Sequence, residues 1–248
     1  MECSAARGRL KTPNDEPMIK ATDVSKSYET PGETVEVLKG LSLELADGEA
    51  ASIVGPSGSG KTTLLNLLGA LDRPTGGSIE IGGQDISKFG DDEAARFRNH
   101  ELGFVFQQHH LLPQLTVMEN VLVPRLSGDW EEAEAETRER AVGLLKSVGL
   151  DHRMDHLPWQ LSGGEKLRTA VCRALVNRPK LVLADEPTGS LDPSGTDRIA
   201  DLLLDLNGSQ KTTLLVVTHN VELAERIGRV FELQGGSLEE RVGGGVSA

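Results

Sequence analysis

The sequence predicts an α/β protein with a central parallel sheet, an antiparallel β subdomain and an inserted helical subdomain. Three observations support this fold class. Short apolar strands alternate with helical segments between residues 18 and 238. Three of those strands run directly into chemically reactive residues, and residues 90–160 are charged and helical in pattern. We therefore expect one α/β domain with a helical insertion.

Strand patterns dominate the beginning of this domain. Residues 18–28 and 35–45 are rich in strand-forming residues, and a run containing Gly and Pro separates them. A short buried strand at 51–54 leads into a glycine-rich loop, and residues 61–71 carry apolar side chains at helical spacing. Residues 76–86 are typical of a strand and a turn.

The expected insertion contains three helical segments. Two are short, at 91–100 and 115–121, and Thr116 has the side chain of an N-cap for the second. The third is a long amphipathic segment at 129–150, with Asp129 as its expected N-cap. After the insertion the pattern predicts strands at 180–185 and 212–220, a crossover helix at 195–207 and a closing hairpin at 231–240. Residues 1–17 and 239–248 are expected to be a disordered tail and a flexible tail.

The composition limits the classes of partner. Among the 248 residues, 38% are hydrophobic and the formal net charge is −12. A duplex nucleic acid or an anionic lipid surface favours a basic protein, so both are excluded as direct partners. Cys3 and Cys172 lack the spacing of a zinc site, and two such cysteines suit a reducing cytosol. No apolar run approaches the roughly 20 residues of a membrane span and no signal core begins the chain, so a membrane role requires a partner protein.

The glycine-rich loop matches the pattern G-x-x-x-x-G-K-[ST] of a phosphate-binding loop. Its glycines let backbone N–H groups surround phosphate oxygens, and the following helix adds its positive N-terminal end. Lys61 neutralises the β- and γ-phosphates and Thr62 can ligate Mg²⁺. The alternative, a Gly/Ser-rich linker, fits poorly between a strand and a helix. The loop residues are Gly55, Pro56, Ser57, Gly58, Ser59, Gly60, Lys61, Thr62 and Thr63.

Two carboxylates follow the buried strand at 180–185. Asp185 can hold Mg²⁺ directly or through water. Glu186 turns a different way, toward the space beyond the γ-phosphate, where it can orient or deprotonate water. Adjacent acids are usually a solvated turn, but here they share a sheet edge with the phosphate loop and with His219, because ligands bind outside the carboxyl ends of parallel strands.

The string LSGGE at residues 161–165 predicts a second anion cradle. The Ser162 hydroxyl and the backbone N–H groups of Gly163, Gly164 and Glu165 stand at the start of a helix. One nucleotide cannot occupy two separate cradles of one subunit, so the geometric solution is a head-to-tail pair in which each cradle closes over the other subunit's nucleotide. An ordinary capped helix is the alternative, but LSGGE stands about 20 residues before the Asp185 strand and downstream of a phosphate loop.

With these motifs the chain resembles the ATP-binding-cassette (ABC) ATPase family over about residues 18–238. The resemblance implies a P-loop NTPase core, ATP and Mg²⁺ as ligands, and ATP hydrolysis. It further assigns Tyr28 to adenine stacking, Gln107 rather than Gln108 to the Mg²⁺ and water beside the helical subdomain, and His219 to the γ-phosphate. Residues 190–192, which end at Asp192, match the loop that crosses the dimer interface. In this reading Glu186 activates water.

A finer resemblance is to the lipoprotein-releasing and macrolide-export group of these ATPases. Residues 153–165 and 195–207 are especially similar to its YbbA-type branch. The resemblance implies a second ABC subunit, with a homodimer expected, and a separate permease with few membrane helices and a large extracytoplasmic domain. The chain is then expected on the cytoplasmic face of the membrane. Hydrolysis would drive export, lipoprotein release or mechanical transmission.

The helix after LSGGE departs from that pattern. The family usually has Gln at the position of Leu167 and Ala at that of Cys172. We expect Leu167 near the surface of the helical subdomain, where it alters coupling or turnover rate.

Two rival functions remain: a non-transport ABC ATPase of the DNA-repair or translation type, and a regulatory ATP-binding protein. The first lacks support because the chain has one cassette, no added module and an acidic charge. The second, a regulatory protein that has lost ATPase activity, is not favoured because every catalytic position holds a residue able to perform its role. The LSGGE string excludes a phosphate-loop kinase.

Overall fold

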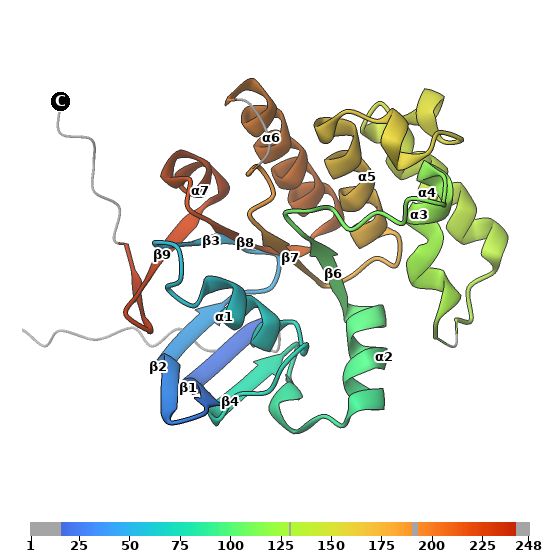
Figure 1. The fold of residues 1–248 in the computed structure, drawn as a ribbon. Coiled ribbons are helices and arrows are strands. Elements are labelled where there is room, and N and C mark those ends of the chain that lie inside the picture. The colour runs from blue at the N-terminus through green and yellow to red at the C-terminus, as the bar shows by residue number, and fades with distance from the viewer. Residues whose placement is uncertain (1–15, 129, 190–192, 242–248) are drawn as a thin grey trace, which may run out of the picture.

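A six-stranded sheet forms the centre of the molecule (Figure 1). The computed structural model describes residues 16–128, 130–189 and 193–241, so most of both expected tails, Asp129 and residues 190–192 lie outside the described residues. The strand order is β10-β9-β3-β8-β7-β6, and all neighbours are parallel except the terminal hairpin. The strands are β3 (Ala50–Val54), β6 (Leu102–Val105), β7 (Leu181–Asp185), β8 (Thr213–Thr218), β9 (Arg229–Gln234) and β10 (Ser237–Glu240). The hairpin of β9 and β10 ends at Glu240, as the sequence pattern predicts, and begins two residues before the expected start at 231.

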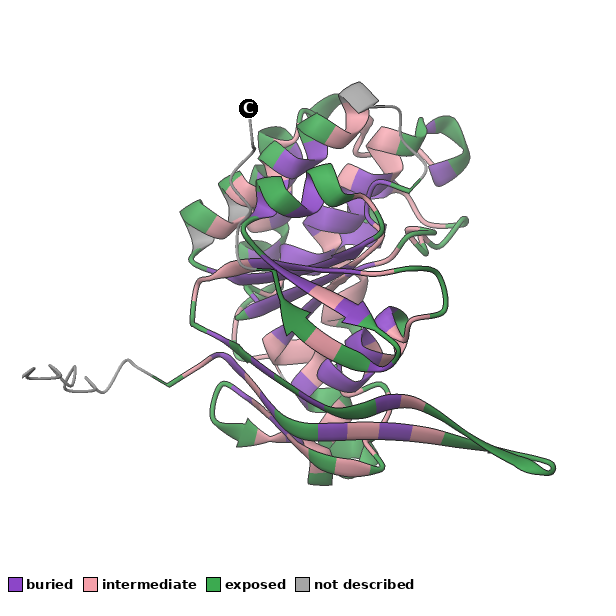
Figure 2. Cartoon of the chain, turned by 90° about the vertical axis from the view of Figure 1, so that its left-hand side faces the viewer, coloured by how far each residue is buried: buried purple, intermediate pink, exposed green. Residues whose placement is uncertain are grey.

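The second sheet is antiparallel and has the order β2-β1-β4-β5. It contains β1 (Ile19–Thr30), β2 (Glu33–Leu45), β4 (Gly76–Ile81) and β5 (Gln84–Asp85). The short helix η1 (Ile86–Lys88) follows it. Figure 2 shows the β1–β2 hairpin projecting from the body with an exposed tip. This sheet is the antiparallel β subdomain that the sequence predicts.

Helix α1 (Lys61–Leu68) lies between the two sheets. Its leucines Leu64, Leu65, Leu67 and Leu68 are fully buried and join one hydrophobic core with residues of both sheets. A second core lies on the opposite face of the central sheet, beneath α5 (Gly163–Leu175), α6 (Pro193–Gln210) and α7 (Val221–Ile227). Burial of these apolar faces on both sides of the sheet fixes its six strands as one platform.

The range 90–160, expected to be mainly helical, also holds a strand of the central sheet. Helix α2 (Asp91–Glu101) passes directly into β6, which pairs with β7. The strand is only four residues long and no turn precedes it, so the sequence pattern does not separate it from the helix. A Cβ at Gly103 would lie 2.5 Å from the carbonyl oxygen of Ala174, so glycine lets α5 pack closely against this strand.

The helical subdomain follows β6. It contains α3 (Val117–Leu122), η2 (Val123–Leu126), α4 (Glu134–Ser147), η3 (Asp151–Arg153) and η4 (Pro158–Gln160). Thr116 caps α3 as expected, because its hydroxyl accepts a hydrogen bond from the Glu119 N–H.

The expected N-cap at Asp129 is wrong, since α4 begins at Glu134 with Ala133 as its N-cap. The preceding residues are held in another conformation. The Glu132 carboxylate accepts hydrogen bonds from Thr137 and Arg140, and its backbone carbonyl accepts one from Arg125. These contacts hold Glu132 against side chains of α4 and of η2.

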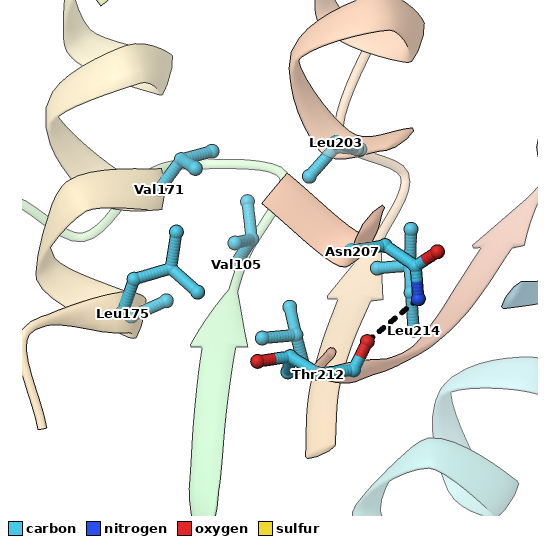
Figure 3. Close-up of a pocket in the computed structure, with 9 residues that line it drawn as sticks. Val105, Val171, Leu175, Leu203, Asn207, Thr212 and Leu214 are labelled. Carbon is cyan, nitrogen blue, oxygen red and sulfur yellow. Dashed lines mark hydrogen bonds between the residues drawn. The ribbon is translucent and has the colours of Figure 1, made fainter. Parts of the chain in front are cut away.

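A small cavity lies inside the second core, between α5, α6 and the central sheet (Figure 3). Its volume is about 10 Å³, which is at the lower limit for one water molecule. The polar side chains in its wall are paired, because the Asn207 amide donates to the Thr212 backbone carbonyl at 2.6 Å and the Thr212 hydroxyl donates to the Pro179 carbonyl at 3.2 Å. The cavity is therefore a packing defect and not a ligand site.

Among the helices of the described residues, none has the length and apolarity needed to cross a membrane.

Candidate functional site

A cleft of about 530 Å³ opens at the carboxyl edge of β3, β7 and β8. The parallel pairing of these strands places their ends side by side, as the sequence predicts. Each end delivers a different group: the phosphate loop after β3, two carboxylates at β7 and His219 after β8. The residues that line the cleft are Val37, Ser57, Gly58, Gly60, Lys61, Thr62, Thr63, Gln107, Asp185, Glu186 and His219.

The loop between β3 and α1 curls around the ammonium of Lys61. Its Nζ donates to the carbonyl oxygens of Gly55 at 2.8 Å and Pro56 at 3.0 Å, and Lys61 is 8% exposed. The cation is thereby held at the floor of the cleft, at the N-terminus of a helix. Lys61 and the helix end together make this floor a site for an anion.

Two glycines of the loop are required by close contacts. A Cβ at Gly55 would lie 2.3 Å from the Leu233 carbonyl oxygen. Gly60 has a φ of +101°, and a Cβ there would lie 2.9 Å from Leu38 and 3.0 Å from Val37. Larger residues would push the loop away from β2 and β9 and change the position of its N–H groups.

Two oxygen donors meet where α1 faces the end of β7. The Thr62 hydroxyl donates to Asp185 Oδ2 at 3.3 Å. Burial raises the pKa of Asp185, and the hydrogen bond from Thr62 opposes that rise. A buried carboxylate next to a hydroxyl is a donor set suited to a hard divalent cation, whose charge would favour the ionised form.

Glu186 is held in an unusual backbone conformation. Its φ is +45°, and its N–H donates to the Val217 carbonyl oxygen at 2.8 Å. Its carboxylate Oε2 accepts hydrogen bonds from Thr218 Oγ1 at 3.1 Å and from His219 Nδ1 at 2.9 Å. Positive φ is costly for glutamate, so the surrounding bonds must hold it. The result is a carboxylate fixed at the mouth of the cleft.

Gln107 reaches the cleft from the loop after β6. A Cβ at Gly189 would lie 3.0 Å from Gln107 Nε2, so the amide packs directly against the turn that follows Glu186. The Gly189 N–H donates to the Glu186 carbonyl oxygen at 3.1 Å. Gln107 therefore contacts the carboxylate segment from the side on which the helical subdomain begins. Asp192, expected to cross a dimer interface, lies outside the described residues.

Tyr28 stands at the rim rather than in the cleft. It lies on β1, and its ring is 40% exposed. Its hydroxyl donates to Asp72 Oδ2 at 3.0 Å. Burial and the Asp72 carboxylate raise the pKa of Tyr28, and the hydroxyl of Thr63, a cleft residue, lowers it in part. The aromatic ring is thus next to the phosphate loop.

The LSGGE segment lies at the N-terminus of α5, and none of its residues lines the cleft of the same chain. The Ser162 hydroxyl accepts a hydrogen bond from the Glu165 N–H and donates to Glu165 Oε2 at 2.8 Å. Arg153 donates to the other carboxylate oxygen at 3.1 Å. Hydrogen bonds from Ser162 lower the pKa of Glu165. Gly163 and Gly164 form the first turn of the helix.

The expectation for Leu167 is wrong. The side chain is fully buried within the second core rather than near the surface, because this face of α5 packs toward the sheet and α3. Cys172, five residues further along the helix, is also buried, and burial raises the pKa of its thiol to about 12. Both departures from the family pattern therefore affect packing and not an exposed contact surface.

Sequence patterns missed two parts of the site. Val37 lines the cleft from β2, although nothing in its local sequence distinguishes it from the neighbouring valine Val35. Thr218, whose hydroxyl donates to Glu186, ends a strand that looks uniformly apolar and buried. The one available signal was its position directly before His219.

Comparison with known proteins agrees with this geometry. Residues 38–189 match the profile of the ABC transporter family. The chain is 50% identical over 231 residues to the lipoprotein-releasing system ATP-binding protein LolD 1 of Rhodopirellula baltica, covering 93% of this chain and 100% of that protein. It is 51% identical over 225 residues to the protein LolD of Pseudomonas fluorescens, with 91% and 98% coverage.

Solved structures of two states of one cassette are also similar. The dimeric structure of MJ0796, a bacterial ABC transporter cassette, has a TM-score of 0.82 and 40% identity, with 92% of this chain and 100% of that one covered. A dimeric post-hydrolysis state of MJ0796 bound to ADP and phosphate gives the same values.

The fold and the comparisons define a nucleoside triphosphatase, and its candidate site is the cleft at the carboxyl edge of a parallel sheet. The chain belongs to the ABC transporter family. It binds ATP, and it is the ATP-hydrolysing subunit of an ABC transporter.

Proposed function

We propose that this chain is the ATPase subunit of a lipoprotein-releasing transporter and that it hydrolyses ATP between two head-to-tail copies. The observation that most directly supports a head-to-tail pair is the position of Ser162. The phosphate loop, both carboxylates and His219 line one cleft, while the second anion cradle lies outside that cleft. A second copy can bring the cradle over the γ-phosphate, and the dimeric structures of the similar MJ0796 cassette support this arrangement.

In this proposal the floor of the cleft binds the triphosphate. Lys61 and the N–H groups from Gly55 to Thr63 hold the β- and γ-phosphates, and Tyr28 stacks on the adenine. Ser162, Gly163, Gly164 and Glu165 of the partner copy complete the charge cage. Such preorganised donors stabilise the charge that develops during phosphoryl transfer.

Mg²⁺ fits the donor set of the cleft. Thr62 Oγ1 and Asp185 Oδ2, 3.3 Å apart, and the amide oxygen of Gln107 are the oxygen ligands that would hold it. When bound, Mg²⁺ neutralises phosphate charge during transfer. The described residues contain no cluster of three or more His, Cys, Asp or Glu side chains suited to a metal, so the remaining ligands would be phosphate oxygens and water.

Glu186 is the proposed general base. Its carboxylate is fixed by Thr218 and His219, so it can accept the proton of a water aimed at the γ-phosphate. His219 donates from Nδ1 to Glu186, and a hydrogen bond from Nε2 to the phosphate would require the imidazolium form, in which both ring nitrogens carry a proton. Loss of the γ-phosphate removes the ligand that joins the two copies, and they separate.

The partner in the membrane is proposed to be a permease with few helices and a large extracytoplasmic domain. The names of the LolD relatives support lipoprotein release as the work performed. Residues 18–238 would form the ATPase domain, with the helical subdomain against the permease at the cytoplasmic face of the membrane. Gln107 links that subdomain to the carboxylate segment, so it would transmit the state of the nucleotide.

The test is the variant Glu186→Gln, with the exposed Glu225→Gln as its control. Glu186→Gln should lose ATP turnover by a factor of about 100 or more and elute as a dimer only with ATP. Glu225→Gln should behave as the wild type. Monomeric Glu186→Gln protein with ATP bound would overturn the head-to-tail site.

A second experiment tests the transport role. The chain and its permease in proteoliposomes should release a lipid-anchored protein when ATP is present. Release at an equal rate without ATP would overturn the transport role.

A further inference from the structure

We propose that Asp72 and Lys26 are positioning residues for the nucleobase, because they fix the ring of Tyr28 against the helix that follows the phosphate loop. The inference deepens the proposed function and rests on it, since it assumes that Tyr28 stacks on the base. It concerns two residues that do not line the cleft and that no sequence motif singles out.

Asp72 uses its two carboxylate oxygens on two different groups. Oδ2 accepts a hydrogen bond from the Tyr28 hydroxyl at 3.0 Å. Oδ1 accepts one from Lys26 Nζ at 2.7 Å and one from the Arg73 N–H at 2.7 Å. The carboxylate is thereby fixed in direction, and bonds to a charged acceptor are stronger than neutral ones. The phenol is therefore held at its far end.

Lys26 contacts one face of the same ring. Its Nζ lies 4.9 Å from the centroid of the Tyr28 ring, within cation–π distance. It also donates to the Arg73 carbonyl oxygen at 2.8 Å, and the residue is only 8% exposed. A buried lysine with two strong acceptors has a fixed position. It covers one face of the ring, and because Tyr28 as a whole is 40% exposed, we take the other face as the one that receives a base.

This arrangement joins the ring to the phosphate site through α1. The helix begins at Lys61, and the loop after it carries Asp72, whose N–H donates to the Asn66 carbonyl oxygen at 3.3 Å. At the start of the same helix, Thr63 lies near the Tyr28 hydroxyl. One rigid element therefore sets both the phosphate contacts and the ring. The separation of base and phosphates becomes a fixed property of the empty site, which reduces the cost of ordering on binding.

The charge states agree with this role. Burial opposes ionisation of Asp72, but the hydrogen bonds from Lys26, Arg73 and Tyr28 outweigh it and lower the pKa of the carboxyl. Burial and Asp72 raise the pKa of Tyr28. At neutral pH an ionised carboxylate thus faces a neutral phenol, so the hydrogen bond between Tyr28 and Asp72 has its proper donor and acceptor.

The test compares ATP with inorganic tripolyphosphate, which engages the phosphate loop and has no base. We would measure both dissociation constants calorimetrically on the intact chain. Asp72→Asn should raise the Kd of ATP about tenfold, because stacking of one base on an aromatic ring contributes an affinity of that size. The same variant should leave the Kd of tripolyphosphate unchanged within twofold. Asp91→Asn, on a fully exposed carboxylate paired with Arg73, is the matched control and should change neither value.

Two further variants separate positioning from folding. In a Tyr28→Phe background, Asp72→Asn should raise the Kd of ATP by a smaller factor than in the wild type, because the part of its effect that acts through the hydroxyl is absent. Lys26→Arg should keep most of the ATP affinity that Lys26→Met loses. The chain has one tyrosine, so an ultraviolet titration reports Tyr28 alone, and its pKa should fall in Asp72→Asn.

Equal losses for ATP and tripolyphosphate, or full additivity with Tyr28→Phe, would overturn the inference and leave the proposed function standing. A wild-type chain that binds neither compound would instead overturn the proposed function.

Discussion

Nδ1 of His219 donates to Oε2 of Glu186 at 2.9 Å, and both side chains lie at the mouth of the same cleft. The two differ in exposure: the His219 side chain is 68% exposed and that of Glu186 is 14% exposed. The histidine is thus the solvent-facing member of the pair. The carboxylate of the other member, Glu186, also accepts a hydrogen bond from the buried Thr218 hydroxyl. This asymmetry predicts which substitution affects chemistry and which affects the protein's stability.

His219→Ala should lower kcat about 100-fold and change the KM for ATP little. The side chain orients the base and can contact the γ-phosphate, and both contacts matter most in the transition state. Thr218→Val should lower kcat less, about tenfold, and should destabilise the fold, because it also removes the acceptor of the Asn220 N–H. Steady-state kinetics with urea unfolding would separate the two effects. The exposed His152→Ala is the control, and a kcat for His219→Ala within twofold of wild type would contradict the prediction.

Ser162→Ala and Thr116→Ala should cost similar stability but differ in activity. Each residue is the N-cap of a capping box, with Glu165 and Glu119 as the reciprocal partners. Loss of either cap should cost about 1 kcal/mol of unfolding free energy. Only Ser162 belongs to the proposed second cradle, so only Ser162→Ala should reduce ATP turnover by tenfold or more. Equal turnover in both variants, measured at saturating ATP, would mean that the Ser162 hydroxyl acts as a cap alone.

The sequence predicts those parts of the fold and site that depend on local patterns. The loop from Gly55 to Thr63 needs its glycines and lysine in a fixed order, so its sequence is diagnostic and the structure has it between β3 and α1. The common edge of β3, β7 and β8 follows from parallel pairing, which any buried strand with a crossover helix implies.

Contacts between distant segments could not be predicted in the same way. Tyr28 and Asp72 are 44 positions apart, and their bond depends on how the antiparallel sheet packs on α1. Strand β6 is too short to show a period of its own. Helix α4 begins at Glu134, and the Glu132 side chain before it contacts Arg140 of the helix, a contact that no local capping pattern indicates. Tertiary contacts decide each of these features.

Leu167→Gln should destabilise the protein by about 2 kcal/mol or more, although Gln is common at this position in the family. Leu167 is fully buried among apolar residues of the second core, and an amide there would lose its hydrogen bonds to water. Lys166→Gln, at the adjacent and partly exposed position, should change stability by less than about 0.5 kcal/mol. Chemical unfolding of both variants checks this, and an unchanged unfolding midpoint for Leu167→Gln would show that the core can supply partners for the amide.

The ion pair between Glu132 and Arg140 should make stability depend on pH in the acid range. Arg140 donates to both carboxylate oxygens, and these hydrogen bonds lower the pKa of Glu132 from 4.5 to about 2. Both side chains are largely shielded, with 23% and 14% exposure for Glu132 and Arg140. Because the folded protein binds this proton less readily than the unfolded chain, the pair's contribution is complete above about pH 4.5. It is lost progressively as the pH falls toward 2.

Glu132→Gln should therefore lower the free energy of unfolding at pH 7 by on the order of 2 kcal/mol. It should also lose less further stability than the wild type when the pH falls from 5 to 3, because the titrating group is gone. Urea unfolding across that range measures both quantities, and Glu131→Gln, on the exposed neighbouring carboxylate, should follow the wild-type curve. Parallel pH curves for wild type and Glu132→Gln would mean that Glu132 has an ordinary pKa in the folded protein. The segment before α4 would then be held by the Arg125 bond to the Glu132 carbonyl and not by charge.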